Sequence, residues 1–147
     1  MIIDRFEGKY MFLSNFFTDM PPVMGYPTSE HAYQAMKTTD KAQRNAIRTC
    51  GSPGMSKKLG RKVTMRSDWD LIKYDVMKFV LMEKFQAGSE LAELLLKTGY
   101  SDLVEGNYWH DQTWGDCSCG RDACKPAGKN WLGILLNERR TLLREVS

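Results

Sequence analysis

The chain has 147 residues, of which 42% are hydrophobic and 27% are charged. This length and composition fit one globular domain and exclude a disordered or fibrous chain. Its 21 basic and 18 acidic side chains leave a net charge of +3, too small to predict non-specific nucleic-acid binding but suited to a site for one or two phosphates.

The start of the chain lacks the charged and apolar regions of a secretory signal, and no apolar run is long enough to span a membrane. We therefore expect a cytoplasmic protein that makes no membrane contact. In that compartment free thiols are the expectation for the four cysteines, Cys50, Cys117, Cys119 and Cys124.

The first seventeen residues mix β-branched and aromatic side chains with Gly8, which predicts short strands and turns, and a proline-rich loop follows. A helix is predicted to begin with Thr28 as its N-cap and to run through Lys37. This helix has Glu30 in its first turn, and Glu30, Gln34 and Lys37 share one face. Ala32, Ala35 and Met36 cover another face.

Four more helices follow from capping residues and apolar periodicity. They are predicted over Asp40 to Gly51, from Ser52 and Pro53 to Gly60, over Ser67 to Gly88 as the longest helix, and from Ser89 to Gly99. A last helix carries Leu132 to Leu143, and a strand is expected at Leu103 to Val104. The predicted fold is therefore a mainly helical α+β single domain, residues 1–147, with a few short strands.

Residues 100–129 have turn-forming, aromatic, acidic and cysteine residues but no sustained period. Thirty irregular residues between two well-defined helices are too many for a simple connection in a compact domain. Long ordered loops of this kind usually carry function.

Four short motifs together resemble the NADAR family, also called the YbiA-like proteins. They are Leu-Ser-Asn-Phe at 13–16, Thr-Ser-Glu-His-Ala-Tyr-Gln-Ala-Met-Lys at 28–37, Asp-Gln-Thr-Trp-Gly at 111–115 and Gly-Lys-Asn-Trp-Leu-Gly at 128–133. The resemblance covers nearly the whole chain. It implies a YbiA-like fold and an N-glycosidase, a hydrolase of N-glycosyl bonds.

In that family one branch is associated with riboflavin-pathway aminopyrimidine intermediates, from which ribose 5-phosphate is released. Another is associated with removal of ADP-ribose from guanine bases in DNA. In both, the bond that breaks joins ribose C1 to an exocyclic amine of a heterocycle. The partner expected from the resemblance is thus a small phosphorylated N-riboside or ADP-ribosylated guanine, and contact with nucleic acid stays open.

Cleavage of a glycosyl bond passes through an oxocarbenium-like state, so it needs a carboxylate to direct water and a proton for the leaving nitrogen. Glu30 is the first candidate for the acid/base role, against the alternative that it only suits the helix dipole. Asp111 is the second catalytic candidate, to orient water or hold ribose hydroxyls, against the alternative of a turn aspartate. Glu105 competes with Asp111 and is kept as a ribose ligand or a supporting group.

Substrate binding is expected to draw on further residue types. Trp114, next to Gly115, offers a flat face for a heterocycle or is a buried core residue. Lys37 and Arg61 are the candidate phosphate ligands, because guanidinium and ammonium groups both bind phosphate. Asn15 and Asn130 could hydrogen-bond to substrate or only tie down turns.

Two histidines complete the chain's ionisable candidates. His31 follows Glu30 directly and points about 100° away around the helix, so we interpret it as a structural, hydrogen-bonding residue. Cys117, Cys119 and Cys124, with His110 as a possible fourth ligand, leave a structural zinc open. Their spacing is not that of paired zinc knuckles, so no catalytic metal and no cofactor are predicted.

The sequence is compatible with three functions. They are an N-glycosidase for a small phosphorylated ribosylamine, an ADP-ribosyl hydrolase for modified nucleic acid, and a non-catalytic ADP-ribose or nucleotide-binding module. The module would use Lys37, Arg61 and Trp114 but has no need of Glu30, so the presence of Glu30 argues for an enzyme.

Overall fold

The chain folds mainly into helices, as the sequence predicts, with four two-residue strands and two 3-10 helices. The computed structural model describes all 147 residues and divides them into two units. The central unit is Asn15–Lys84, and the terminal unit combines Met1–Ser14 with Phe85–Ser147. The single domain expected over residues 1–147 stays a prediction. None of the helices is both long and apolar enough to cross a bilayer.

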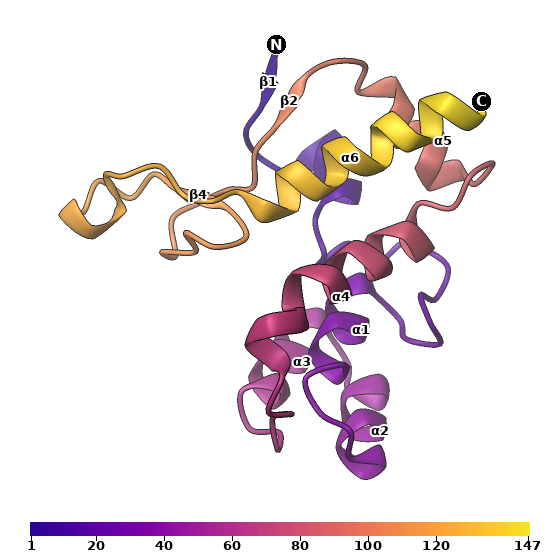
Figure 1. The fold of residues 1–147 in the computed structure, drawn as a ribbon, viewed down its shortest axis with the longest axis vertical. Coiled ribbons are helices and arrows are strands. Elements are labelled where there is room, and N and C mark those ends of the chain that lie inside the picture. Colours follow the sequence, from indigo (N-terminus) through magenta and orange to yellow (C-terminus); the bar gives the residue numbers. More distant parts are fainter. The chain divides into compact units, whose positions relative to one another are not determined.

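The central unit is built around its shortest helix. It contains α1 (Ser29–Ala35), α2 (Lys41–Thr49), α3 (Pro53–Gly60) and α4 (Trp69–Lys84). Helix α1 packs against all three others, and all seven of its residues are buried (Figure 1). Ala32 and Ala35 present almost no side-chain volume, which lets neighbouring helices approach α1 closely.

The predicted helix starts of the central unit are confirmed by their caps. Thr28, Asp40 and Ser52 each accept a hydrogen bond from the backbone N–H three residues further on. These bonds satisfy N–H groups that the first turn of a helix leaves without partners. The helix ends differ more: α1 stops at Ala35 instead of Lys37.

The helix predicted over Ser67 to Gly88 is shorter in the structure. Helix α4 begins at Trp69 and ends at Lys84; it has 16 residues, as does the last helix, so these two share the greatest length. Gly88, with a φ of 82°, closes the turn in which Ser89 N–H donates to the Gln86 carbonyl. Glycine suits that left-handed position because it lacks a Cβ.

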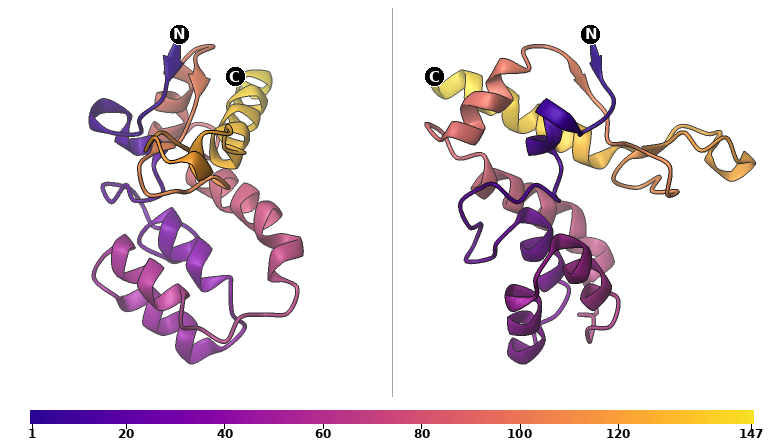
Figure 2. Two further views of the ribbon diagram at one scale, coloured as in Figure 1. Left: turned by 90° about the vertical axis from the view of Figure 1, so that its left-hand side faces the viewer. Right: turned by 180° about the vertical axis from the view of Figure 1, so that it is seen from behind.

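The terminal unit holds all of the named strands. Strand β1 (Ile2–Ile3) pairs in parallel with β2 (Asp102–Leu103), and β3 (Gly106–Asn107) pairs in parallel with β4 (Asp116–Cys117). Its helices are α5 (Glu90–Lys97), α6 (Trp131–Val146) and the 3-10 helices η1 (Gly8–Leu13) and η2 (Asp122–Cys124). Figures 1 and 2 show the segment with β4 and η2 extending away from the first turn of α6.

Two details of the terminal unit depart from the sequence prediction. The 3-10 helix η1 occupies residues where only strands and turns were expected. The strand expected at Leu103 to Val104 lies one residue earlier. Strands of two residues have no alternation to detect, so their positions depend on pairing between distant segments.

His31 has the structural role inferred for it. Only 2% of its surface is exposed; its Nδ1 lies 2.7 Å from Thr28 Oγ1 and its Nε2 lies 3.3 Å from the Cys50 carbonyl oxygen. Burial lowers the pKa of His31, and the hydrogen bond to the Cys50 carbonyl opposes that shift. A neutral imidazole that donates from Nε2 and accepts at Nδ1 satisfies both neighbours.

The first prediction concerns the pH dependence of stability. The pKa of His31 is lower in the folded than in the unfolded state, so below pH about 6.5 the unfolded chain takes up this proton more readily. The free energy of unfolding should therefore fall as the pH decreases from 7 to 5.5. In a His31→Gln variant, measured by urea unfolding at both values, this fall should be smaller. An equal fall in both proteins would contradict the role of His31.

Candidate active site

The Glu30 carboxyl group is buried in the first turn of α1, with 7% of the residue exposed. Its Oε1 accepts a hydrogen bond of 2.9 Å from Gln34 Nε2, one turn further along the helix. Its backbone N–H donates to the Asn15 carbonyl oxygen at 3.1 Å. A carboxyl group held in this way has a fixed orientation, as general acid/base chemistry requires.

Gln34 is itself positioned by the close approach of α3. A Cβ at Gly60 would overlap the Gln34 side-chain amide, so only glycine leaves room for that amide at this point of the helix contact. Gln34 Oε1 is buried without a hydrogen-bond partner, and so is Asn15 Oδ1. Two buried acceptors therefore belong to the residues that hold Glu30.

The charges of three other cations of the central unit act on Lys37. Burial lowers the pKa of Lys37; the Glu30 carboxylate raises it, and the positive charges of Arg61, Lys57 and Lys73 lower it further. The Lys37 ammonium also lies 5.9 Å from the centre of the Tyr33 ring. A concentration of like charges beside one carboxylate attracts an anion such as phosphate.

Asp111 forms a tight turn in the terminal unit. Its Oδ1 accepts hydrogen bonds from the backbone N–H groups of Thr113 at 3.1 Å and Trp114 at 2.9 Å. The Asn107 side chain fastens the same turn, since it accepts from Asp111 N–H and donates to the Asp111 carbonyl oxygen. The turn role considered for Asp111 is thus present in the structure, and its catalytic role stays a prediction.

This turn also holds the start of the last helix through backbone hydrogen bonds. The carbonyl oxygens of Thr113 and Trp114 accept from the N–H groups of Trp131 and Leu132, the first two residues of α6. Trp114 is half-buried and meets Trp131 edge to face, with ring centres 5.5 Å apart and planes at 78°. Trp114 is thereby held by the first turn of α6.

Asn130 uses its side chain within the protein. Its Oδ1 accepts from the Glu105 backbone N–H at 3.0 Å, and its Nδ2 donates to the Leu103 carbonyl oxygen at 2.9 Å. Its backbone has a φ of 51°, a left-handed conformation that asparagine tolerates. The structure therefore shows the turn-fastening role of Asn130, and its contact with substrate stays a prediction, as does that of the half-buried Glu105.

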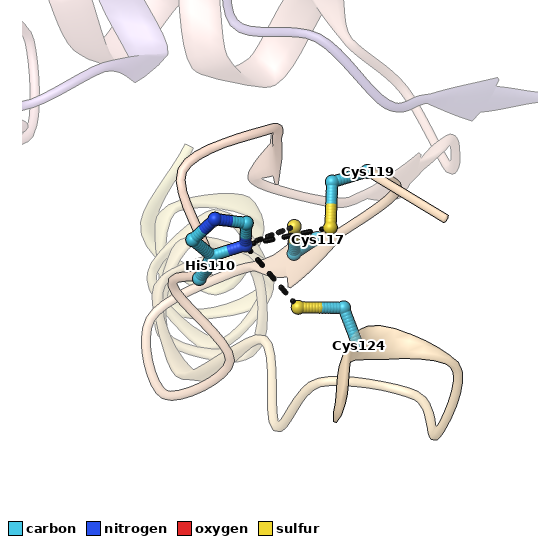
Figure 3. A group of neighbouring side chains, drawn as sticks. All are labelled: His110, Cys117, Cys119 and Cys124. Carbon is cyan, nitrogen blue, oxygen red and sulfur yellow. Dashed lines mark hydrogen bonds between the residues drawn. The ribbon is translucent and has the colours of Figure 1, made fainter. Parts of the chain in front are cut away.

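The three cysteines of the loop meet one histidine. His110 Nδ1 lies 3.7 Å from the sulfur of Cys117 and 3.4 Å from the sulfurs of Cys119 and Cys124 (Figure 3). All four possible ligand atoms lie within 4.8 Å of one another. The remaining cysteine, Cys50, belongs to the central unit.

The site residues predicted from sequence thus form two groups. Glu30, Lys37, Arg61 and Asn15 belong to the central unit, and the others belong to the terminal unit: Glu105, Asp111, Trp114 and Asn130. Sequence reasoning missed Lys73, an α4 residue whose charge acts on Lys37, and Asn107, which fastens the Asp111 turn. Lys73 has no local signal because it acts on a segment distant in sequence, whereas Asn107 lies only four residues before Asp111, within reach of local turn rules.

Comparison with known proteins identifies the family. The NADAR domain model matches residues 4–144. N-glycosidase YbiA of Escherichia coli is 40% identical over 120 residues, which are 80% of this chain and 71% of that protein. An N-glycosidase of Nostoc punctiforme is 37% identical over 126 residues, 82% of this chain and 76% of that protein. The chain belongs to the NADAR family.

Two further matches extend the comparison. A riboflavin biosynthesis protein of Vibrio vulnificus is 35% identical over 143 residues, 95% of this chain but 37% of that longer protein. The NMR structure of E. coli YbiA matches with a TM-score of 0.80 at 37% identity, covering 99% of this chain and 86% of that one. The predicted YbiA-like, mainly helical α+β fold is confirmed.

The second prediction tests the contact between Gly60 and Gln34. Gly60→Ala should destabilise the protein by about 1–3 kcal/mol, the usual cost of overpacking, because the new methyl group displaces the buried Gln34 amide. Gly54→Ala in the same helix is the matched control, since a Cβ there makes only an ordinary contact. That control should be neutral or stabilising by up to about 1 kcal/mol. Urea unfolding measures both, and equal stabilities would contradict the close approach.

Proposed function

We propose that this protein hydrolyses the bond between C1 of a phosphorylated ribose and an exocyclic amine of a heterocycle, as in the aminopyrimidine intermediates of riboflavin synthesis. The chain is a hydrolase of N-glycosyl bonds, the class named for its YbiA and Nostoc relatives. The observation that carries the proposal is the buried Glu30 carboxyl group beside the cations around Lys37.

Glu30 is the proposed general acid/base. In the reaction the C1–N bond breaks, water adds its oxygen to C1, and the leaving amine gains a proton. The Glu30 carboxylate takes the proton from the attacking water and passes it to the amine, so that one water is consumed. The carboxylate also stabilises positive charge that develops on the ribose ring. Gln34 fixes its orientation through the 2.9 Å hydrogen bond.

Lys37 and Arg61 are the proposed phosphate ligands, with Lys57 and Lys73 adding positive charge. Their mutual repulsion is relieved when a phosphate dianion binds among them, which favours phosphorylated over unphosphorylated ribosides. Lys37 lies two residues beyond the end of α1, and the Glu30 charge acts on it. A ribose 5-phosphate unit would thus place its phosphate at Lys37 and its C1 near Glu30.

One buried acceptor suits the ribose. Ribose hydroxyls donate hydrogen bonds, and Asn15 Oδ1 is a buried oxygen without a donor in the protein, whereas Gln34 Oε1 packs against Gly60 of α3. An unsatisfied buried acceptor costs about 1–3 kcal/mol, so a ribose hydroxyl that donates to Asn15 Oδ1 would relieve that cost. This supports the predicted role of Asn15 in substrate binding.

The other four residues predicted to act on substrate belong to the terminal unit. Asp111 orients water or holds ribose hydroxyls through the oxygen that its turn does not use. Trp114 stacks on the heterocycle, and Glu105 contacts the ribose. Asn130 contributes to substrate binding by fixing the loop that contains Glu105. Of these four, Asp111 is the proposed second carboxylate.

Product analysis separates this proposal from its alternatives. The purified protein is incubated separately with the aminopyrimidine ribosylamine phosphate and with ADP-ribosylated guanine DNA, and the released sugar is identified by mass spectrometry. Release of ribose 5-phosphate from the first substrate supports the proposal. Release of ADP-ribose from the DNA alone would favour the ADP-ribosyl hydrolase. Binding without any release would indicate a non-catalytic module.

The third prediction concerns Glu30. Glu30→Gln should lower kcat by about a hundredfold or more, the usual contribution of a general acid/base, and leave the fold intact. Glu90→Gln is the matched control, because Glu90 also lies in the first turn of a helix but is exposed. It should keep normal turnover. Near-normal turnover in a folded Glu30→Gln protein would remove Glu30 from the mechanism.

The fourth prediction concerns the phosphate. Replacing Lys37 or Arg61 with Met should weaken binding of the phosphorylated substrate by roughly 10- to 150-fold, since a hydrogen bond to a charged group is worth about 1.5–3 kcal/mol. The dephosphorylated ribosylamine should respond little to either change. KM is measured for both substrates, with Lys58→Met, an exposed lysine of α3, as control. Equal losses for both substrates would contradict phosphate binding here.

A further inference from the structure

Residues 106–129 lack a hydrophobic core of their own. Their regular structure is limited to β3, β4 and the three residues of η2. Cys117 and Cys124, with 4% and 8% of their surfaces exposed, are the only buried apolar residues in this segment. Tyr108 and Trp109, its largest apolar side chains apart from Trp114, are both more than half exposed. A segment of this size without a core needs a crosslink to hold one conformation.

The two buried cysteines belong to a cluster of four side chains that can each supply one metal ligand. In a tetrahedral zinc site with Zn–S of about 2.3 Å and Zn–N of about 2.0–2.1 Å, a nitrogen and a sulfur lie about 3.6 Å apart. The three distances from His110 Nδ1 to the sulfurs, 3.4, 3.4 and 3.7 Å, match that value (Figure 3). We infer that His110, Cys117, Cys119 and Cys124 bind one structural zinc ion.

The backbone directs these four side chains to one point. Pairing of β3 with β4 places Cys117 beside Asn107, three residues before His110. His110 has a φ of 71°, which is uncommon for a residue other than glycine, and Gly120, with a φ of 86°, turns the chain after Cys119 toward Cys124. Strained or left-handed backbone of this kind persists where surrounding bonds fix it.

Gln112 ties together the segments that carry the ligands. Its Oε1 accepts from the Cys117 backbone N–H at 2.6 Å, and its Nε2 donates to the carbonyl oxygens of Cys124 at 3.4 Å and Pro126 at 2.8 Å. Groups that fix the ligands of a metal are a regular part of protein zinc sites. A Cβ at Gly128 would overlap both the Gly115 carbonyl oxygen and the Gln112 amide, so glycine leaves room for these hydrogen bonds.

The ligand set decides the class of metal and its role. Three thiolates and one imidazole favour zinc, and four protein ligands fill its tetrahedral sphere, which leaves no position for water or substrate. The zinc is therefore structural. It anchors the turn that begins at Asp111, directly after His110, and through that turn it positions Trp114.

Metal content is the first test. Protein purified under reducing conditions without chelator should contain one zinc ion per chain, as measured by inductively coupled plasma mass spectrometry. Cys119→Ser and Cys124→Ser should each lose it, and Cys50→Ser, the change of the only cysteine outside the cluster, should retain it. Full zinc content in both cluster variants would overturn the inference.

A cobalt titration uses only the wild-type protein, so its result does not depend on whether the cysteine variants fold. Wild-type protein freed of metal and kept reduced should bind one Co²⁺ with the strong visible absorption of tetrahedral cobalt and the charge-transfer bands of cobalt–thiolate bonds. A reduced wild-type protein that gives neither band would overturn the inference. So would a disulfide within the cluster in freshly purified protein that binds no metal after reduction.

Hydrogen exchange tests the structural role without reference to activity. Removal of the metal should speed amide exchange in residues 106–129 by tenfold or more and leave α1 unchanged. Unchanged exchange in residues 106–129 would overturn the structural role. Because these readouts do not use the glycosidase reaction, failure of the zinc inference and failure of the proposed function are distinguishable.

Discussion

The central unit depends on the complete burial of α1. This helix has only seven residues, and isolated helices shorter than about 12–15 residues are marginal in water, so contacts with α2, α3 and α4 must hold it. Burial on every side also encloses its polar residues, each of which then needs a partner. Ser29 donates to the Asn15 carbonyl oxygen, His31 contacts Thr28 and the Cys50 carbonyl oxygen, and Gln34 donates to Glu30.

The buried oxygen atoms that lack a hydrogen-bond donor connect the fold to the proposed chemistry. Gln34 Oε1 and Asn15 Oδ1 stay without donors, and the charge of Lys37 is opposed by those of Arg61, Lys57 and Lys73. A phosphorylated ribose offers hydroxyl donors and negative charge in one molecule. The terminal unit is stabilised differently. Its long loop has no hydrophobic core and is held by side-chain amides, by the turn at Asp111 and, in our inference, by zinc.

Sequence predicted the elements that depend on local rules. Thr28, Asp40, Ser52 and Ser89 are the observed N-caps, because capping is decided within a few residues. Helical spacing likewise placed Glu30 and Gln34 on one face of α1, whereas Lys37 lies two residues beyond its end. What depends on distant contacts was not predictable: the effect of the Lys73 charge on Lys37 and the overlap that forces glycine at Gly60. The sequence did suggest His110 and the three cysteines as a possible zinc site, but their spacing alone did not favour one. Motif resemblance found Asp111 and Trp114, but not the bonds that fix their turn.

The central claim, that water attacks ribose C1 with help from Glu30, is tested most directly by an isotope. The wild-type protein is allowed to react with the phosphorylated ribosylamine in ¹⁸O-labelled water, the products are reduced at once to prevent exchange at C1, and each is weighed by mass spectrometry. The account predicts one ¹⁸O on the C1 oxygen of the sugar, an unlabelled aminated heterocycle, and about a hundredfold slower formation of the same labelled sugar in Glu30→Gln. Label in the heterocycle, which would place the attack on the other side of the nitrogen, would contradict the account.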